Sequence, residues 1–208
     1  MAAHGRRLTG WLAAGLVLAG VFLTGTGLGK LDLLPGLPSL SFGRAAAAGT
    51  GSALAPSRPV RISIPAIGVR APVNPVGLAE DGSIATPSLQ RKNEAGWYER
   101  GPTPGQYGPA IIVGHVDGTK GPAVFHKLGT LRPGQLIEVV RRDRRVAIFQ
   151  VDEVATYDKA SLPTKKIYGD FSRPGLRVIT CGGQWVGGDL GYAENVVVFA
   201  SLVRTRKT

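Results

Sequence analysis

The chain has 208 residues, enough for one medium-sized domain with appendages, and 30 of them are glycine and 15 proline. These frequent turn-forming residues, together with short periodic segments, favour many short strands over long helices. The formal net charge of +11 is typical of proteins that meet nucleic acid, an anionic membrane or an anionic polymer. The sequence has no zinc-ligand spacing, basic helix or aromatic-interleaved basic run, and so gives no support to nucleic-acid binding.

The N-terminal region contains an uncharged apolar stretch. Residues 8–29 form a run of 22 residues without a charged side chain. As a helix this run would be about 33 Å long, enough to cross a bilayer. Arg6 and Arg7 precede them, and the positive-inside rule then places the N-terminus in the cytoplasm. We therefore expect residues 1–30 to form a cytoplasmic tip and a single transmembrane helix, with the rest outside the cell. The alternative is a cleaved signal peptide ending near the alanine run 45–48.

The remainder divides into a linker and a domain. Residues 31–58 have scattered prolines and no amphipathic period, which predicts an extracellular linker with little order. Residues 59–208 form the predicted domain, and its strands are short. About eight strands with few helices predict an all-β barrel or sandwich. In chain order the expected elements are strands at 60–64 and 71–78, a helical turn at 93–100, a strand at 110–113, a short helix at 124–131, and strands at 136–140, 146–151, 176–181 and 193–202.

Cys181 is the single cysteine of the chain and stands where an apolar strand gives way to two glycines. A strand end fixes the backbone while leaving the side chain accessible, as a nucleophile requires. The alternative is a small apolar residue that caps the strand. His115 also follows an apolar strand and a glycine, so the fold could bring it beside Cys181 for thiol catalysis. Of the other histidines, His4 lies in the N-terminal tip and His126 is expected on the surface.

Two further residues are candidates for this site. If the strands ending at Cys181 and beginning near Asn195 pair antiparallel, Asn195 lies close to the cysteine and its amide could donate to an oxyanion. It could equally cap the turn locally. Asp117 could orient the imidazole of His115 or form an Asx turn after the strand.

These blocks, in this order, resemble the sortase family, and most closely its actinobacterial class F-type group. The resemblance covers Pro59 to the C-terminus. It is carried by Gly96-Trp97-Tyr98, Gly101-Pro102-Thr103-Pro104-Gly105, Gly114-His115-Val116-Asp117, Gly121-Pro122-Ala123-Val124-Phe125, Leu176-Arg177-Val178-Ile179-Thr180-Cys181-Gly182-Gly183 and Tyr192-Ala193-Glu194-Asn195-Val196-Val197-Val198.

The resemblance implies an eight-stranded sortase-type β-barrel with short helices and a cysteine transpeptidase on the outer face of a Gram-positive membrane. Its substrates would be surface proteins with a C-terminal sorting signal of the Leu-Pro-x-Thr-Gly kind. Cys181 would attack the Thr carbonyl to form an acyl-thioester, and His115 would protonate the leaving amine. The acceptor would be an amine of a peptidoglycan precursor or of another protein; water as acceptor would make the enzyme a hydrolase.

The sequence departs from this family at one position. Well-known sortases carry an oxyanion-stabilising Arg on the last strand, and here that position falls on Asn195, so the electrostatic contribution should be weaker. Arg177 shares a strand face with Cys181 and is a second candidate, although it lies about 13 Å away along the strand.

Two other functions compete with this prediction. One is a non-catalytic, membrane-tethered β-barrel that binds anionic wall polymer through its basic domain. The other is a different cysteine amidase with a β core, although the order of His before Cys argues against a papain-like enzyme. The scattered histidines and cysteine do not make a ligand set, so we expect no metal or other cofactor, while calcium dependence stays open.

Overall fold

A computed structural model describes residues 52–188 and 191–208. The predicted transmembrane helix and most of the predicted linker lie outside these residues. Within the part of the chain that is described, no helix is long and apolar enough to cross a membrane.

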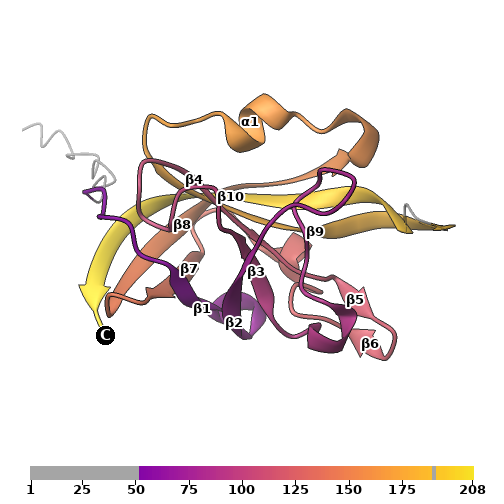
Figure 1. Cartoon of the computed structure of the whole chain (residues 1–208), viewed down its shortest axis with the longest axis horizontal. Coiled ribbons are helices and arrows are strands. Elements are labelled where there is room, and N and C mark those ends of the chain that lie inside the picture. Colours follow the sequence, from indigo (N-terminus) through magenta and orange to yellow (C-terminus); the bar gives the residue numbers. More distant parts are fainter. Residues whose placement is uncertain (1–51, 189–190) are drawn as a thin grey trace, which may run out of the picture. The chain divides into compact units, whose positions relative to one another are not determined.

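The domain is a closed barrel in which the strands follow the order β1-β2-β3-β4-β9-β10-β8-β7 (Figure 1). The prediction of an all-β, eight-stranded barrel is therefore confirmed. Most neighbouring strands are antiparallel, but β2 pairs with β3 and β4 pairs with β9 in parallel. The barrel strands are β1 (Pro59–Ile64), β2 (Val69–Val76), β3 (Ala95–Tyr98), β4 (Gly108–Val113), β7 (Leu136–Arg141), β8 (Arg145–Asp158), β9 (Pro174–Gly187) and β10 (Gly191–Lys207).

The remaining elements are short. A two-stranded ribbon follows β4 and consists of β5 (Asp117–Gly118) and β6 (Gly121–Pro122). The helices are η1 (Pro65–Ile67), η2 (Leu89–Arg91), η3 (Leu128–Thr130), η4 (Lys159–Ser161) and α1 (Thr164–Tyr168).

Two local predictions were wrong. The helical turn expected at 93–100 is strand β3, because tertiary contacts override local preference there. Trp97 in that strand is 3% exposed, and its indole Nε1 donates to the carbonyl of Pro102 at 3.0 Å. The helix expected at 124–131 is reduced to the single 3₁₀ turn η3.

Inward-facing side chains alternate along the strands and fill the barrel, as the burial pattern of β7 shows. On β9 and β10 the outward face is also covered, because α1 lies over it (Figure 1). Ile167 of α1 packs there against Val197 and Phe199. Burial on both faces explains why residues 196–200 of β10 are continuously apolar rather than alternating.

The barrel's packing begins slightly before β1, within the predicted linker. Leu54 is 9% exposed and belongs to the core, and its N–H donates to the carbonyl of Gly105 at 2.8 Å. The side chain of Arg141 is 1% exposed and donates to the carbonyl of Ala55 at 2.5 Å. The last few residues of the predicted linker are thus ordered by the domain that follows.

Candidate active site

His115 and Cys181 lie at the ends of two adjacent parallel strands. The register of β4 and β9 pairs Val113 with Ile179. Beyond this pair, the N–H of Gly114 donates to the carbonyl of Ile179 at 3.2 Å. The hydroxyl of Thr180 donates in return to the carbonyl of Gly114 at 2.8 Å. These two hydrogen bonds connect the ends of β4 and β9 immediately before His115 and Cys181.

Asn195 lies directly opposite Cys181 in the antiparallel pair of β9 and β10. The register predicted from the sequence is therefore confirmed, and the three candidate residues occupy neighbouring strand lines in the order His115, Cys181, Asn195. Leu176 and Val178 of β9 face the barrel core. Alternation then turns Cys181 outward, to the face that α1 covers further along the strand.

Two glycines shape the turn from strand to loop around the site. At Gly114, a Cβ atom would lie 2.6 Å from the ring of Phe125, so the close approach of the segment after β6 requires glycine. Gly183 has φ of 73° and lies where the β9–β10 register shifts. A Cβ atom there would overlap the carboxylate of Glu194. Gly183 thus permits a bulge that starts the outer part of the β9–β10 hairpin.

The imidazole of His115 is oriented by a backbone carbonyl. Its Nε2 donates to the carbonyl O of Pro87 at 2.6 Å. A carbonyl that holds one ring nitrogen fixes the ring orientation and the tautomer, which is the role of the third member of a catalytic triad. Sequence reasoning missed Pro87 because any residue supplies a carbonyl, and the 77–94 loop carries no pattern that reports its position.

Asp117 adopts neither of its two expected roles. It begins β5, and its carboxylate accepts a hydrogen bond from the hydroxyl of Tyr192 on β10. This bond raises the pKa of Tyr192 above its ordinary value, and the charge of Cys181 contributes in the same direction. Tyr192 lies on the same β9–β10 hairpin as Cys181, and the sequence alone did not identify it.

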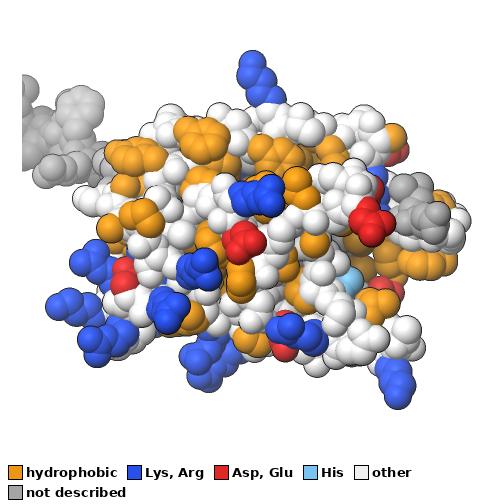
Figure 2. Space-filling model, in the orientation of Figure 1, with side chains coloured by type: hydrophobic (Ala, Val, Ile, Leu, Met, Phe, Trp, Pro, Cys, Tyr) orange, Lys and Arg blue, Asp and Glu red, His pale blue; other side chains and the backbone are white. Residues whose placement is uncertain are grey.

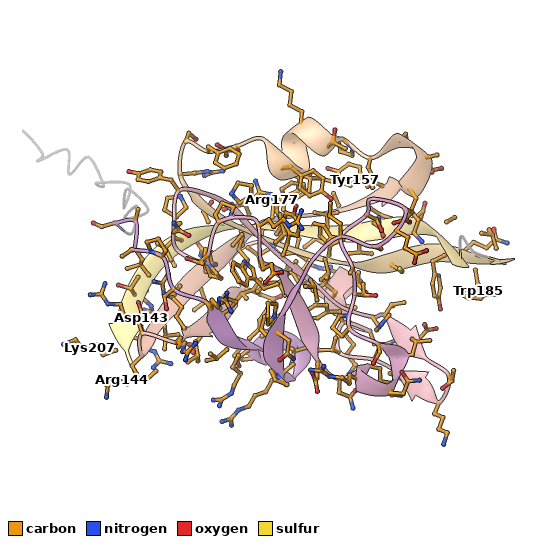
Figure 3. The ribbon with its side chains drawn as sticks, viewed as in Figure 1. Asp143, Arg144, Tyr157, Arg177, Trp185 and Lys207 are labelled. Carbon is orange, nitrogen blue, oxygen red and sulfur yellow. The ribbon has the colours of Figure 1, made fainter. Side chains whose placement is uncertain are left out.

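Arg177 points away from Cys181 and is not placed to replace the missing arginine. Its Nη1 lies beside Gly175, towards the start of β9, and its guanidinium carbon lies 4.7 Å from the ring centre of Phe199. Figure 3 shows Arg177 near Tyr157 on the α1 side of the sheet, far from Trp185 on the hairpin. The side chain is 6% exposed, and its burial lowers the pKa of the guanidinium.

The other candidate features lie apart from this pair. His126 is exposed, as expected, and its Nδ1 lies 3.2 Å from the carbonyl of Val116. A pocket of about 340 Å³ is lined by His126, Lys127 and Arg70 among others, but not by His115 or Cys181. Within residues 52–188 and 191–208, no group of three or more His, Cys, Asp or Glu could hold a metal ion.

Several solved structures similar to this chain are described as sortases C. Sortase C of Streptococcus pneumoniae has a TM-score of 0.54 and 20% identity over 69% of this chain and 64% of its own. Sortase C-1 of Actinomyces oris has a TM-score of 0.54 and 19% identity over 69% of this chain and 72% of its own. Sortase C1 of Streptococcus suis has a TM-score of 0.55 and 17% identity over 71% of this chain and 73% of its own. At these identities the likeness shows the fold, and the class F-type assignment stays a prediction.

No curated protein sequence matches the chain. The model of the sortase domain matches residues 62–203, which include every candidate residue of the site. Because this match covers well over half of the chain, the protein belongs to the sortase family and is a cysteine transpeptidase.

Proposed function

We propose that this sortase cleaves a C-terminal sorting signal of the Leu-Pro-x-Thr-Gly kind between Thr and Gly, and transfers the new carboxyl end to an amine of the cell envelope. The observation that supports the proposal is the pairing of β4 and β9, whose aligned ends immediately precede His115 and Cys181. A cysteine activated by a neighbouring histidine is the usual arrangement for acyl transfer through a thioester.

Each chemical step has a residue to perform it. The Cys181 thiolate attacks the Thr carbonyl carbon, and the amide of Asn195 donates to the oxyanion that forms. The C–N bond to Gly then breaks as the imidazole of His115 protonates the departing amine, leaving an acyl-thioester. Because Nε2 of His115 donates to Pro87, Nδ1 is the nitrogen available for this proton. The incoming amine gives a proton back to the imidazole as it attacks the thioester and frees the thiolate.

The acceptor amine has two sources of distinct chemistry, a peptidoglycan precursor and a lysine of another protein. The similar structures include one described in terms of pilin substrate specificity, which makes a protein amine a reasonable acceptor to test. We further propose that residues 8–29 anchor the enzyme in a Gram-positive membrane with the barrel outside, and that it belongs to the class F-type group. Support for these two points comes from the sequence pattern and the sequence resemblance.

The test is turnover of a panel of sorting peptides by the purified chain, with a glycine-based amine, a diaminopimelate-containing stem peptide or a lysine peptide as acceptor. We expect the Gly-containing fragment to be released and the Thr end to join one of these amines, with His115→Ala inactive. Binding of anionic wall polymer with no cleavage of any peptide would overturn the proposal and favour the non-catalytic alternative.

A further inference from the structure

One hydrogen bond joins the loop that carries His115 to the hairpin that follows Cys181. It runs from the hydroxyl of Tyr192 to a carboxylate oxygen of Asp117, residues that are 75 apart in sequence. Asp117 follows His115 by two residues, and Tyr192 precedes Asn195 by three. The bond therefore links the segments that hold all three residues of the candidate site.

The ring of Tyr192 is itself held in place by the hairpin. Tyr192 pairs with Trp185 across β9 and β10, and the two rings meet edge to face with centroids 5.1 Å apart at 75°. Such a contact adds to the stability of a cross-strand pair. A phenol fixed at its ring and bonded at its hydroxyl is a rigid connection, unlike a long charged side chain.

We propose that Tyr192 and Asp117 are positioning residues of the sortase reaction, whose hydrogen bond holds the His115 loop against the β9–β10 hairpin and so keeps the imidazole beside Cys181. The inference rests on the proposed roles of His115 and Cys181 in catalysis. The strand-end bonds of Gly114 and Thr180 fix the loop on the β4 side, and the Tyr192 bond fixes it on the β10 side. The loop is thereby held from both flanks of the cysteine.

In this proposal the hydrogen bond between Tyr192 and Asp117 holds the His115 loop in place, and the negative charge of Asp117 is not required. Asp117→Asn keeps a carbonyl oxygen that can accept from Tyr192, whereas Asp117→Ala and Tyr192→Phe each remove the bond. We therefore expect Asp117→Asn to retain most activity. The two disruptive variants should each lower kcat by about tenfold while leaving KM nearly unchanged, because the reacting groups lose alignment but substrate contacts stay.

The single cysteine of the chain provides a readout that needs no substrate. Alkylation of Cys181 by iodoacetamide follows its thiolate character, which a correctly placed imidazole promotes. With the full-length chain, the alkylation rate followed by mass spectrometry should fall several-fold in Tyr192→Phe and Asp117→Ala. The double variant should fall no further. Tyr107→Phe, which changes an exposed phenol before β4, is the matched control and should react like the wild type.

The outcomes separate this inference from the proposed function. Equal alkylation rates and equal kcat in the wild type, Tyr192→Phe and Asp117→Ala would overturn it, as would losses that add in the double variant. Loss of activity in Asp117→Asn equal to that of Asp117→Ala would also overturn it. If Tyr192→Phe fails to fold, the comparison of Asp117→Asn with Asp117→Ala decides the same point. A wild type that cleaves no sorting peptide, but shows the expected alkylation pattern, would reject the substrate and leave the positioning pair standing.

Discussion

The hydrogen bond between Thr180 and Gly114 gives a prediction that links stability to catalysis. Thr180 is 4% exposed, and its hydroxyl donates to the carbonyl of Gly114 at 2.8 Å. Thr180→Val keeps the shape of the side chain but leaves that carbonyl without its donor. A buried polar group left unpaired costs about 1–3 kcal/mol. For a domain of this size each kcal/mol lowers the Tm by about 2–4 °C, so we expect a fall of about 2–12 °C.

Activity should fall as well, because this bond aligns the two strand ends that present His115 and Cys181. A displacement of about 1 Å in a reacting group can cost about 100-fold in rate. We expect kcat/KM for a sorting peptide to drop by about 10- to 100-fold in Thr180→Val, measured well below its Tm.

Thr130→Val is the matched control for Thr180→Val. The hydroxyl of Thr130 donates to the carbonyl of Lys127 at the same 2.8 Å, but the site is exposed. Water can replace the lost donor there, and surface substitutions of this kind change stability by about 0.5 kcal/mol or less. A Thr180→Val variant that is as stable as Thr130→Val, or that keeps wild-type kcat/KM, would refute the proposed coupling of the strand ends.

Three further substitutions test other parts of the structure. Asn195→Ala should lower kcat by about 100-fold if its amide donates to the oxyanion, and unchanged kinetics would remove Asn195 from the site. Arg177→Met should change the unfolding free energy by less than about 1 kcal/mol, because the buried Nε of Arg177 has no hydrogen-bond partner; a loss above about 3 kcal/mol in urea unfolding would contradict this reasoning. The pKa of Asp143 is lowered by its hydrogen bond from Arg141, so this pair stabilises the fold above the ordinary carboxyl pKa and the stabilisation is lost as the pH falls below it. In thermal melts at about pH 2 to 4, the wild type should therefore lose Tm more steeply than Asp143→Asn, and parallel curves would show that the pair contributes nothing.

Many of the basic side chains on the face seen in Figure 2 lie in its lower left part, and the others are scattered singly. Residues 1–50 contain four basic residues and one acidic residue, so the rest of the chain carries most of the +11 charge. Such a surface favours encounter with an anionic envelope in general and specifies no single ligand.

The sequence predicted those features of the site that depend on neighbouring strands. The glycine-rich connection after Cys181 indicated a hairpin, and antiparallel pairing then placed Asn195 opposite the cysteine. The ends of the strands were harder to predict. Strand β8 continues to Asp158 through polar residues, because pairing with β10 sustains it where hydrophobic alternation has ended.

The features that sequence reasoning missed depend on long-range contacts. The parallel pairing of β4 and β9, which aligns the strand ends that precede His115 and Cys181, joins strands that are separated in sequence by β7 and β8. The Pro87 carbonyl has no side-chain signature, and the Tyr192–Asp117 bond needs the closed barrel to bring its partners together. Arg177 was a candidate because it shares a face with Cys181, and only the side-chain direction in the structure excludes it.

Trapping the acyl-enzyme tests the central claim most directly. The chain should be incubated with a Leu-Pro-x-Thr-Gly peptide, quenched in acid, and its intact mass determined, with Cys181→Ala treated in parallel. We predict a mass increase equal to the peptide portion ending in Thr, located on Cys181, absent from Cys181→Ala and released by hydroxylamine. An unmodified wild-type mass across the panel of sorting peptides, or an adduct that persists in Cys181→Ala, would contradict a thioester mechanism at Cys181.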